Sequence, residues 1–316
     1  MRVFRQAWLF PAFLLLAGGC KSETNPVGPA RSIPRYVLAL DRAWQLNLPE
    51  VRRFDASALV FEPNGDLLTL SDQNPGIFRI VFHDGSTNAD LARLPECFTE
   101  EQMAPFAKEK IGRYDCEGLA EDSQGRLYVS EESNRWILRF DRAKHTMERL
   151  DIDFTPVKKY FDPADLNASF EGVAVNGRTL YVANERKKGR IITVDLDTLK
   201  VTDDFCPRPG NQPFFDVHFS DLCWFKGALY ALLREDWVIL KLDPATRAIL
   251  AEYNYQEVEN TRAFAYHKIY PIVGVMEGLA VDDHYFWMVT DNNGLGRISS
   301  PDDIRPTLFR CPRPDR

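Results

Sequence analysis

Short apolar runs separated by turns recur through the body of the chain. The first run of each unit begins at residue 57, 117, 171, 221 or 277, which gives a period of 50 to 60 residues. A second apolar run follows each of these, at 67–70, 127–129, 180–182, 229–231 and 286–289. A third run follows four of them, at 77–80, 136–140, 191–194 and 238–242. Gly-bearing turns such as Asn176-Gly177 separate the runs, so we expect them to pair as β-hairpins.

Four short strands in a repeat of this length are typical of a β-propeller blade. We therefore predict an all-β fold, a β-propeller with five four-stranded blades. A sixth, degenerate blade drawn from residues 31–56 or from a long inter-blade segment stays open. The segment 35–40 is predicted to close the ring against the last blade. Because the repeat runs through the whole body, we expect residues 32–316 to form a single domain.

Three longer insertions interrupt the repeat, at 98–115, 154–169 and 254–275. The first has the composition of a helix. Loops between propeller blades commonly form the binding surface on one face, so we expect these insertions to contribute to it.

The first twenty residues have the pattern of a bacterial lipoprotein signal. Arg2 and Arg5 precede an apolar stretch at 7–16, and small residues lead into Cys20. The stretch is shorter than the roughly 20 residues of a bilayer span, so it is predicted to be a secretory signal at 1–19. Cys20 would be lipidated, and residues 20–31 would form a tether. The alternative is an ordinary signal peptide cleaved nearby, which leaves an unmodified Cys20.

The N-terminal pattern also predicts the location of the chain. A lipid on Cys20 would anchor an otherwise soluble body at the cell envelope, with no membrane contact besides the lipid. Lys21 follows the cysteine, and the Asp that signals inner-membrane retention in enteric bacteria is absent there. This favours the outer membrane or a periplasm-facing position if the source is Gram-negative.

The net charge of the chain limits the classes of partner that we expect. The chain of 316 residues has a formal net charge of −7, and removal of residues 1–19 takes away two arginines, which makes it −9. Phosphate backbones need clustered Lys and Arg, so no nucleic acid partner is expected. We expect a monomer whose partner is a small molecule or an envelope protein.

Five cysteines follow Cys20 in what would be an oxidising compartment. Cys97 with Cys116, and Cys206 with Cys223, would each close a short inter-blade connection. The repeated sequence Cys-Pro-Arg-Pro allows Cys206 to pair with Cys311 instead, and buried thiols are a further alternative.

Acidic residues recur at the start of the first run in four of the five repeats. First strands of propeller blades line the central channel, so equivalent positions converge on its axis. Carboxylates gathered there repel one another and need a cation or protons to coexist. Calcium takes six to eight hard oxygens and suits such a ring. The predicted metal ligands are Glu117, Glu171, Asp221 and Glu277, with Ser57 as the fifth member of the ring. The alternative is structural: the carboxylates accept backbone N–H groups from the neighbouring blade.

A second tier of polar residues follows the second runs. It consists of Asp72, Glu132, Asn184 or Glu185, Arg234 and Asp291. Arg234 is the base of this tier and is predicted to neutralise acids or to hold an anionic substrate group. His218, three residues before Asp221, is a candidate general base, with a packing role as the alternative.

Two segments carry a family resemblance. Residues 55–60 followed by Ser71-Asp72, and Cys116-Glu117-Gly118 followed by Leu119-Ala120, resemble the phytase-like "esterase-like activity" propellers and the SdiA-regulated propellers. The resemblance covers most of residues 35–300 and implies a propeller. Of the acidic run that precedes Pro-Ala in phytases, this chain has only a fragment, at 162–165. The resemblance therefore does not imply inositol phosphate as the substrate. The more distantly similar paraoxonase and gluconolactonase propellers imply a channel calcium.

These observations together predict a lipid-anchored propeller that hydrolyses an ester, lactone or phosphoester with Ca²⁺ as cofactor. Serine-nucleophile, zinc-protease, phosphate-loop and dinucleotide motifs are absent from the sequence. The alternative function is a non-enzymatic propeller that binds a ligand or protein at the cell envelope.

Overall fold

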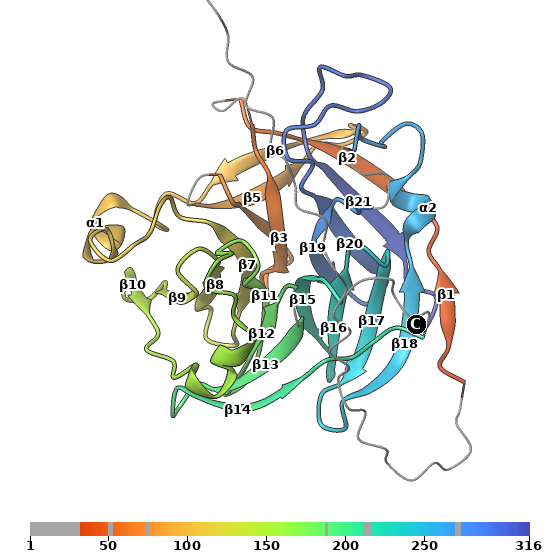
Figure 1. Cartoon of the computed structure of the whole chain (residues 1–316). Coiled ribbons are helices and arrows are strands. Elements are labelled where there is room, and N and C mark those ends of the chain that lie inside the picture. Colours follow the sequence, from red (N-terminus) through yellow and green to blue (C-terminus); the bar gives the residue numbers. More distant parts are fainter. Residues whose placement is uncertain (1–31, 50–52, 74–75, 187–188, 211–216, 269–272) are drawn as a thin grey trace, which may run out of the picture. The chain divides into compact units, whose positions relative to one another are not determined.

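The computed structural model describes residues 32–49, 53–73, 76–186, 189–210, 217–268 and 273–316 (Figure 1). Residues Ile33–Arg316 form one compact unit. The predicted signal peptide, the lipidation of Cys20 and the tether lie outside the described residues. No helix in the described ranges has the length and apolar character needed to cross a membrane.

The strands confirm the predicted all-β propeller with five blades of four strands (Figure 1). The first blade is β3 (Ala56–Phe61), β4 (Leu67–Ser71), β5 (Ile77–Phe82) and β6 (Asn88–Arg93). The second is β7 (Cys116–Glu121), β8 (Leu127–Glu131), β9 (Trp136–Asp141) and β10 (Thr146–Arg149). The third is β11 (Phe170–Asn176), β12 (Thr179–Asn184), β13 (Arg190–Asp195) and β14 (Lys200–Phe205). The fourth is β15 (Phe219–Phe225), β16 (Ala228–Leu233), β17 (Val238–Asp243) and β18 (Ala248–Asn254). The fifth is β19 (Met276–Val281), β20 (Tyr285–Thr290), β21 (Thr307–Pro312) and β2 (Arg42–Asn47).

The first strands of the blades form the inner ring. β3, β7, β11, β15 and β19 each contact the next in this order, and β19 contacts β3. Apolar clusters fill the spaces between neighbouring blades; one of them combines Leu70 of the first blade with Leu119 and Val129 of the second. Burial between blades therefore holds the inner strands against one axis, with their side chains directed to a shared channel.

The ring is closed by a different segment from the one predicted. Residues 42–47, as β2, pair with β21 and complete the fifth blade. The predicted segment instead forms β1 (Arg35–Val37), which adds a parallel fifth strand to the fourth blade beside β18. The reason is apolar packing, because Trp44 of β2 is buried and stacks on Trp287 of β20 at 5.7 Å between ring centroids. Val37, in contrast, is largely exposed.

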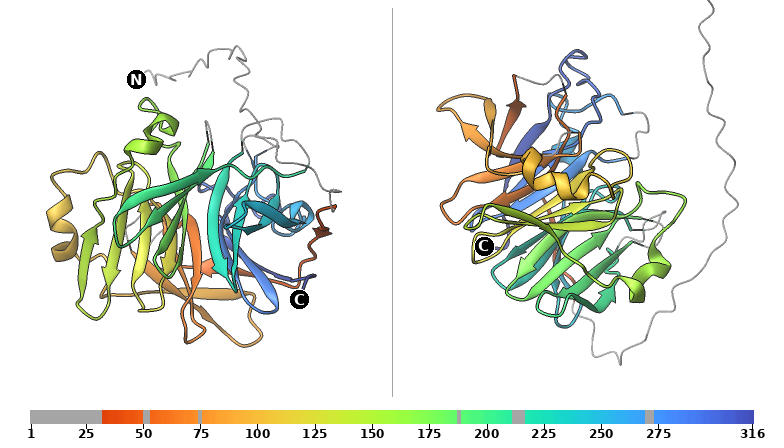
Figure 2. Two further views of the ribbon diagram at one scale, coloured as in Figure 1. Left: turned by 90° about the horizontal axis from the view of Figure 1, so that it is seen from below. Right: turned by 90° about the vertical axis from the view of Figure 1, so that its left-hand side faces the viewer.

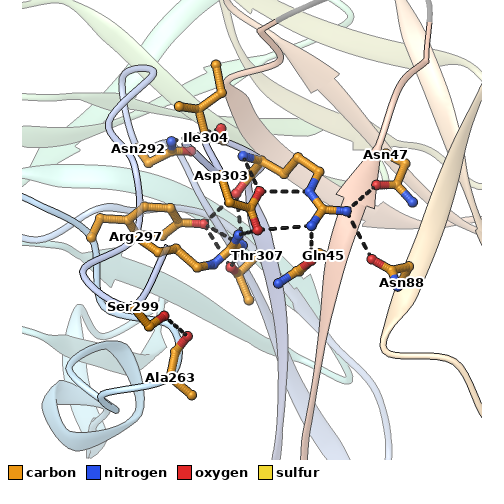
Figure 3. Close-up of polar contacts among 12 residues, drawn as sticks. Gln45, Asn47, Asn88, Ala263, Asn292, Arg297, Ser299, Asp303, Ile304 and Thr307 are labelled. Carbon is orange, nitrogen blue, oxygen red and sulfur yellow. Dashed lines mark hydrogen bonds and ion pairs between the residues drawn. The ribbon is translucent and has the colours of Figure 1, made fainter. Parts of the chain in front are cut away.

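Arg305 joins the last blade to the first. Figure 3 labels its partners Gln45, Asn47, Asn88 and Asp303. Its guanidinium donates to Asn47 Oδ1 at 2.7 Å and to Asn88 Oδ1 at 3.0 Å, and it also bonds Gln45. Asp303 accepts from the same group at 2.7 and 2.9 Å and so fixes its orientation. Because Asn47 lies on β2 and Asn88 on β6, this arginine holds the parallel junction between the two blades.

Short helices occupy the insertions. α1 (Glu100–Met103) begins at Thr99, whose side chain and that of Gln102 form a capping box. The helical prediction for the first insertion is thus confirmed, and α1 packs beside β10 (Figures 1 and 2). The remaining ones are the 3₁₀ helices η1 (Ala104–Phe106) and η2 (Thr155–Tyr160), and α2 (Gln256–Glu259).

The two predicted disulfides are not formed. Cys97, Cys116 and Cys223 carry free thiols, as does Cys311. Cys97 and Cys116 are both buried in the apolar cluster between the first two blades, where they pack as small hydrophobic side chains. Burial raises the pKa of Cys97 and Cys223 to about 12, so these thiols stay protonated.

Candidate functional site

Every inner strand has a β-bulge at the same level of the channel. A bulge inserts one residue into a strand and re-aims its side chain. The register shifts fall between Ala56 and Ala58, Cys116 and Gly118, Phe170 and Val173, Phe219 and Asp221, and Met276 and Gly278. The residues at these bulges are Ser57, Glu117, Glu171, Ser220 and Glu277. The inner ring therefore has three carboxylates and two hydroxyls.

This register corrects the predicted fourth carboxylate of the ring. Asp221 lies one position after the bulge, where Gly118 stands in the second blade, and Ser220 occupies the ring position. The error arose because acidic residues alone were matched between the repeats. The apolar residue that follows gives the correct register, since Leu222 corresponds to Leu119.

Glycine follows the ring glutamate because neighbouring inner strands approach closely there. A Cβ on Gly118 would lie 2.5 Å from the carbonyl oxygen of Glu171, and one on Gly278 would lie 2.7 Å from the carbonyl carbon of Ala58. A Cβ on Gly172 would overlap the backbone of Asp221. The glycine of the repeated Glu-Gly pair thus allows neighbouring inner strands to approach closely. The side chain of the glutamate is not needed for this approach.

Asp221 has the structural role that was the alternative for the ring acids. It is fully buried, and its two carboxylate oxygens accept the backbone N–H of Leu222 at 2.8 Å and of Leu279 at 2.7 Å. Burial raises the pKa of Asp221, and these backbone hydrogen bonds oppose the rise. Asp221 is not among the residues that line the cavity described next.

An acidic cavity of about 230 Å³ lies at the ring, and all of its lining residues are polar or charged. Eight carboxylates meet three guanidinium groups in it. Arg113 and Asn167 come from the first two insertions, which therefore contribute to the site as expected. The lining consists of Arg53, Asp72, Gln73, Arg113, Asp115, Glu117, Glu132, Asn167, Glu171, Glu185, Arg234, Glu277, Asp291 and Asn293.

The second tier lines this cavity with Glu185 in place of Asn184. The residue directly after each second strand lines the cavity. In the first, second, third and fifth blades, its backbone N–H donates to the segment that enters the inner strand. Glu132 donates in this way to Asp115 O at 2.8 Å, and Glu185 donates to Ser169 O at 2.7 Å. Asn184 is still within β12 and is not among the lining residues.

Asp72 lies at the centre of the acidic groups. It provides an oxygen within 4.8 Å of oxygens of Asp55 and Asp291, and within the same distance of oxygens of Asp115 and Glu117. Its Oδ1 is buried and has no hydrogen-bond partner. Burial, with the charge of Asp55 as the next contribution, raises the pKa of Asp72 to about 6.

Glu171 and Glu117 of the ring also lie close to other carboxylates. Glu171 has oxygens of Glu132 and Glu185 within 4.8 Å. Burial and then the charge of Glu185 raise the pKa of Glu132 to about 9. Burial raises the pKa of Glu117 well above its usual range, and the charge of Glu132 adds to this rise. At neutral pH and without a cation, the cavity therefore holds protons.

Arg234 neutralises one side of the cavity. It donates to Glu185 Oε1 at 2.7 Å and to Glu235 Oε1 at 3.0 Å, and it forms an ion pair with Glu277. Glu277 is therefore neutralised by Arg234, and neutralisation of acids was one of the two roles predicted for this base.

His218 does not line the cavity. Its Nδ1 lies 3.1 Å from Glu235 Oε2. Although burial favours the neutral form of Glu235, the charge of Arg234 and the hydrogen bond of His218 lower its pKa to about 2. The histidine thus supports the arginine network, which agrees with the packing alternative.

The sequence reasoning missed Asp55 and Asp115. Both stand two residues before their ring position, and the equivalent position in the fourth blade is His218. That shared offset was visible in the repeat. Arg53 and Arg113 were also missed, although each stands four residues before its ring position, in the matching segments Arg53-Phe54-Asp55 and Arg113-Tyr114-Asp115. Arg53 forms an ion pair with Asp55.

The chain is similar to known proteins in sequence and in fold. A family model described as "Phytase-like: Esterase-like activity of phytase" matches residues 54–294. No curated protein matches the chain. Glutaminyl cyclase of Myxococcus xanthus aligns with a TM-score of 0.58 and 15% identity over 89% of this chain and 97% of that one. Virginiamycin B lyase of Staphylococcus aureus aligns with a TM-score of 0.41 and 15% identity over 87% and 75%. At such identities the likeness concerns the fold alone.

Proposed function

This chain belongs to the phytase-like family, and we propose that its acidic cavity binds Ca²⁺ and hydrolyses an ester, lactone or phosphoester. Asp72 is the observation that carries this proposal. One of its oxygens is buried without a hydrogen-bond partner, and two pairs of carboxylates lie within reach of it. A buried oxygen of this kind needs a ligand or a proton.

The donor set fits calcium. Two oxygens on one Ca²⁺ lie no more than about 5 Å apart, because each stands about 2.3–2.6 Å from the ion. The oxygens of Asp55, Asp72 and Asp291 meet this condition, as do those of Asp72, Asp115 and Glu117. The predicted ligand Glu117 is kept in this set, whereas Glu277 is already paired with Arg234 and Asp221 with backbone N–H groups.

The ion and two residues have roles in the proposed hydrolysis. Bound Ca²⁺ would polarise the substrate oxygen. Arg113, 3.6 Å from Asp72 and 3.8 Å from Asp115 with about half of its side chain exposed, can orient an acyl or phosphoryl oxygen at the mouth. Glu132, whose pKa is raised to about 9 in the metal-free cavity, is the candidate general acid that would donate a proton to the leaving oxygen.

The test is a panel of nitrophenyl esters, lactones and nitrophenyl phosphate with the full chain, in EDTA and in Ca²⁺. We expect turnover of at least one class that is lost in EDTA and restored by calcium. Glu132→Gln should lower kcat about 10²-fold or more, as expected for loss of a general acid. Exposed Glu101→Gln is the matched control. Calcium binding with no turnover across the panel would contradict the hydrolase and support the ligand-binding alternative.

We also propose that lipid on Cys20 anchors the propeller at the cell envelope. The signal pattern at 1–19 supports this location. Labelling with a radioactive fatty acid should mark the wild type and leave Cys20→Ala unmarked. Equal labelling of both chains would contradict the anchor.

A further inference from the structure

A second cavity, of about 580 Å³, lies among the opposite ends of the inner strands. Its lining includes 59–61, 119–121, 173–175, 222–225 and 280–282. These residues follow the bulge in each strand, whereas the acidic cavity lies at and before it. None of the described residues lines both cavities, so this cavity is a separate site, which we name the aromatic cavity.

The aromatic side chains that line this cavity are held in place by contacts with other side chains. Trp224 stacks on Tyr181 with ring centroids 5.9 Å apart and planes at 4°. Trp287 stacks on Trp44 and donates from Nε1 to Asp282 Oδ2 at 2.7 Å. Phe61 meets Trp287 edge to face at 5.8 Å. Rings fixed in this way need no ordering when a ligand arrives, which favours binding.

The ionisable side chains among the described residues that line the aromatic cavity are mainly acids. Three of its described lining residues are acids, Glu62, Glu121 and Asp282, and none of them is Lys, Arg or His. Asp282 accepts backbone N–H groups of His284 and Tyr285 besides the indole of Trp287. Glu62 is paired with Arg142. These two acids are therefore already satisfied by the protein.

Glu121 differs from the other two acids. Its Oε2 is buried and has no hydrogen-bond partner. The carboxylate stands at the last position of β7, beside an apolar wall formed by Leu119 and Val173. A buried carboxylate oxygen without a partner costs free energy, which a donor on a ligand would remove.

We propose that the aromatic cavity binds an organic cation, an ammonium group on an apolar body. The ammonium would donate to Glu121, and the apolar body would pack on the rings of Trp224 and Trp287. Aromatic faces attract cations by about 0.5–2 kcal/mol, more where the site is desolvated. The cavity also has the size of small-molecule sites, which span about 300–1,000 Å³.

Three probes of equal size and different charge test this proposal. They are 2-phenylethylammonium, 2-phenylethanol and phenylacetate, titrated into the full chain in EDTA, with the indole N–H signals of Trp224 and Trp287 followed by NMR. We expect the cation to bind about tenfold more tightly than the alcohol, equal to about 1.4 kcal/mol, and phenylacetate to bind most weakly. Equal affinities for the three probes, or no saturable shift with the cation, would overturn the proposal.

Single substitutions test which residue contacts the ammonium group of the probe. Glu121→Gln keeps the shape of the side chain and should abolish the preference for the cation over the alcohol, while exposed Glu101→Gln retains it. Asp72→Asn, in the acidic cavity, should leave the preference unchanged. An unchanged preference in Glu121→Gln would overturn the assignment of Glu121. The result in Asp72→Asn separates this site from the proposed calcium site.

Discussion

The carboxylate of Asp221 in the fourth blade accepts the backbone N–H of Leu279 in the fifth blade at 2.7 Å. Its other oxygen accepts Leu222 N–H at 2.8 Å, so one buried side chain joins two inner strands. Asp221 lines neither the acidic cavity nor the aromatic cavity. It is part of the channel wall and has no place in the proposed calcium site.

Asp221→Asn should therefore destabilise the fold. The amide nitrogen would face a backbone donor, and a buried donor without an acceptor costs about 1–3 kcal/mol. We expect urea denaturation to show a loss of about that size in the free energy of unfolding. Asp283→Asn, at an exposed ion pair with Lys226, is the control and should change it by less than about 1 kcal/mol. Equal stability of the two variants would contradict the role given to Asp221.

Gly172→Ala should be more damaging than a glycine substitution in open space. A Cβ at residue 172 would overlap the backbone of Asp221, whereas a Cβ on Gly177, whose φ is +56°, would have no atom within 4 Å. Substitution at Gly177 should cost about 1 kcal/mol through its left-handed backbone. We expect Gly172→Ala to lose clearly more, as measured by thermal unfolding. A similar loss for both would show that close strand approach does not explain the Glu-Gly pair.

Arg305→Gln should loosen the closure of the ring. It removes the charged group that bonds Asn47 and Asn88 on the two strands of the junction. Hydrogen bonds to charged groups contribute about 1.5–3 kcal/mol each, partly offset here by solvent exposure. Hydrogen exchange should speed up in β2 and β6 before it does in β12. Uniform acceleration across all blades would contradict a local clamp.

The protein without metal should lose stability as pH rises. The pKa of Asp72 is raised to about 6 and that of Glu132 to about 9 in the fold. In the unfolded chain both groups titrate near pH 4, so the folded state binds more protons above this pH and its stability falls as pH increases. In EDTA, we expect Tm to decrease from pH 5.5 to pH 8.5, and Asp72→Asn should reduce the slope below pH 7. A Tm that rises over this range would contradict the raised pKa values of Asp72 and Glu132.

The sequence predicted the architecture because period and turns are local signals. Five blades, the hairpins and the helical insertion followed from them. The closing strand was misplaced because 35–40 is the more apolar of the two segments, whereas the stacking of Trp44 on Trp287 places 42–47 in the fifth blade. The fourth ring position was misplaced by one residue because the bulge, a backbone feature, decides whether Ser220 or Asp221 occupies the ring position.

The candidate site was predicted in outline and not in its contacts. The repeat placed Glu117 and Glu171 at one level and Asp72, Glu132 and Asp291 at the next. It could not show that Arg234 would pair with Glu277, because an ion pair across two blades leaves no periodic signal. Nor could it show that Asp55 and Asp115 approach Asp72.

Calorimetric titration of Ca²⁺ into the metal-free full chain at pH 7.5 tests the central claim most directly. Asp72→Asn removes the carboxylate that belongs both to the set with Asp55 and Asp291 and to the set with Asp115 and Glu117. Asp283→Asn is the matched surface control. We predict saturable binding with proton release in the wild type and in Asp283→Asn, and a loss of affinity of at least about tenfold in Asp72→Asn. The absence of binding to the wild type, or equal affinity in Asp72→Asn, would contradict the proposed calcium site.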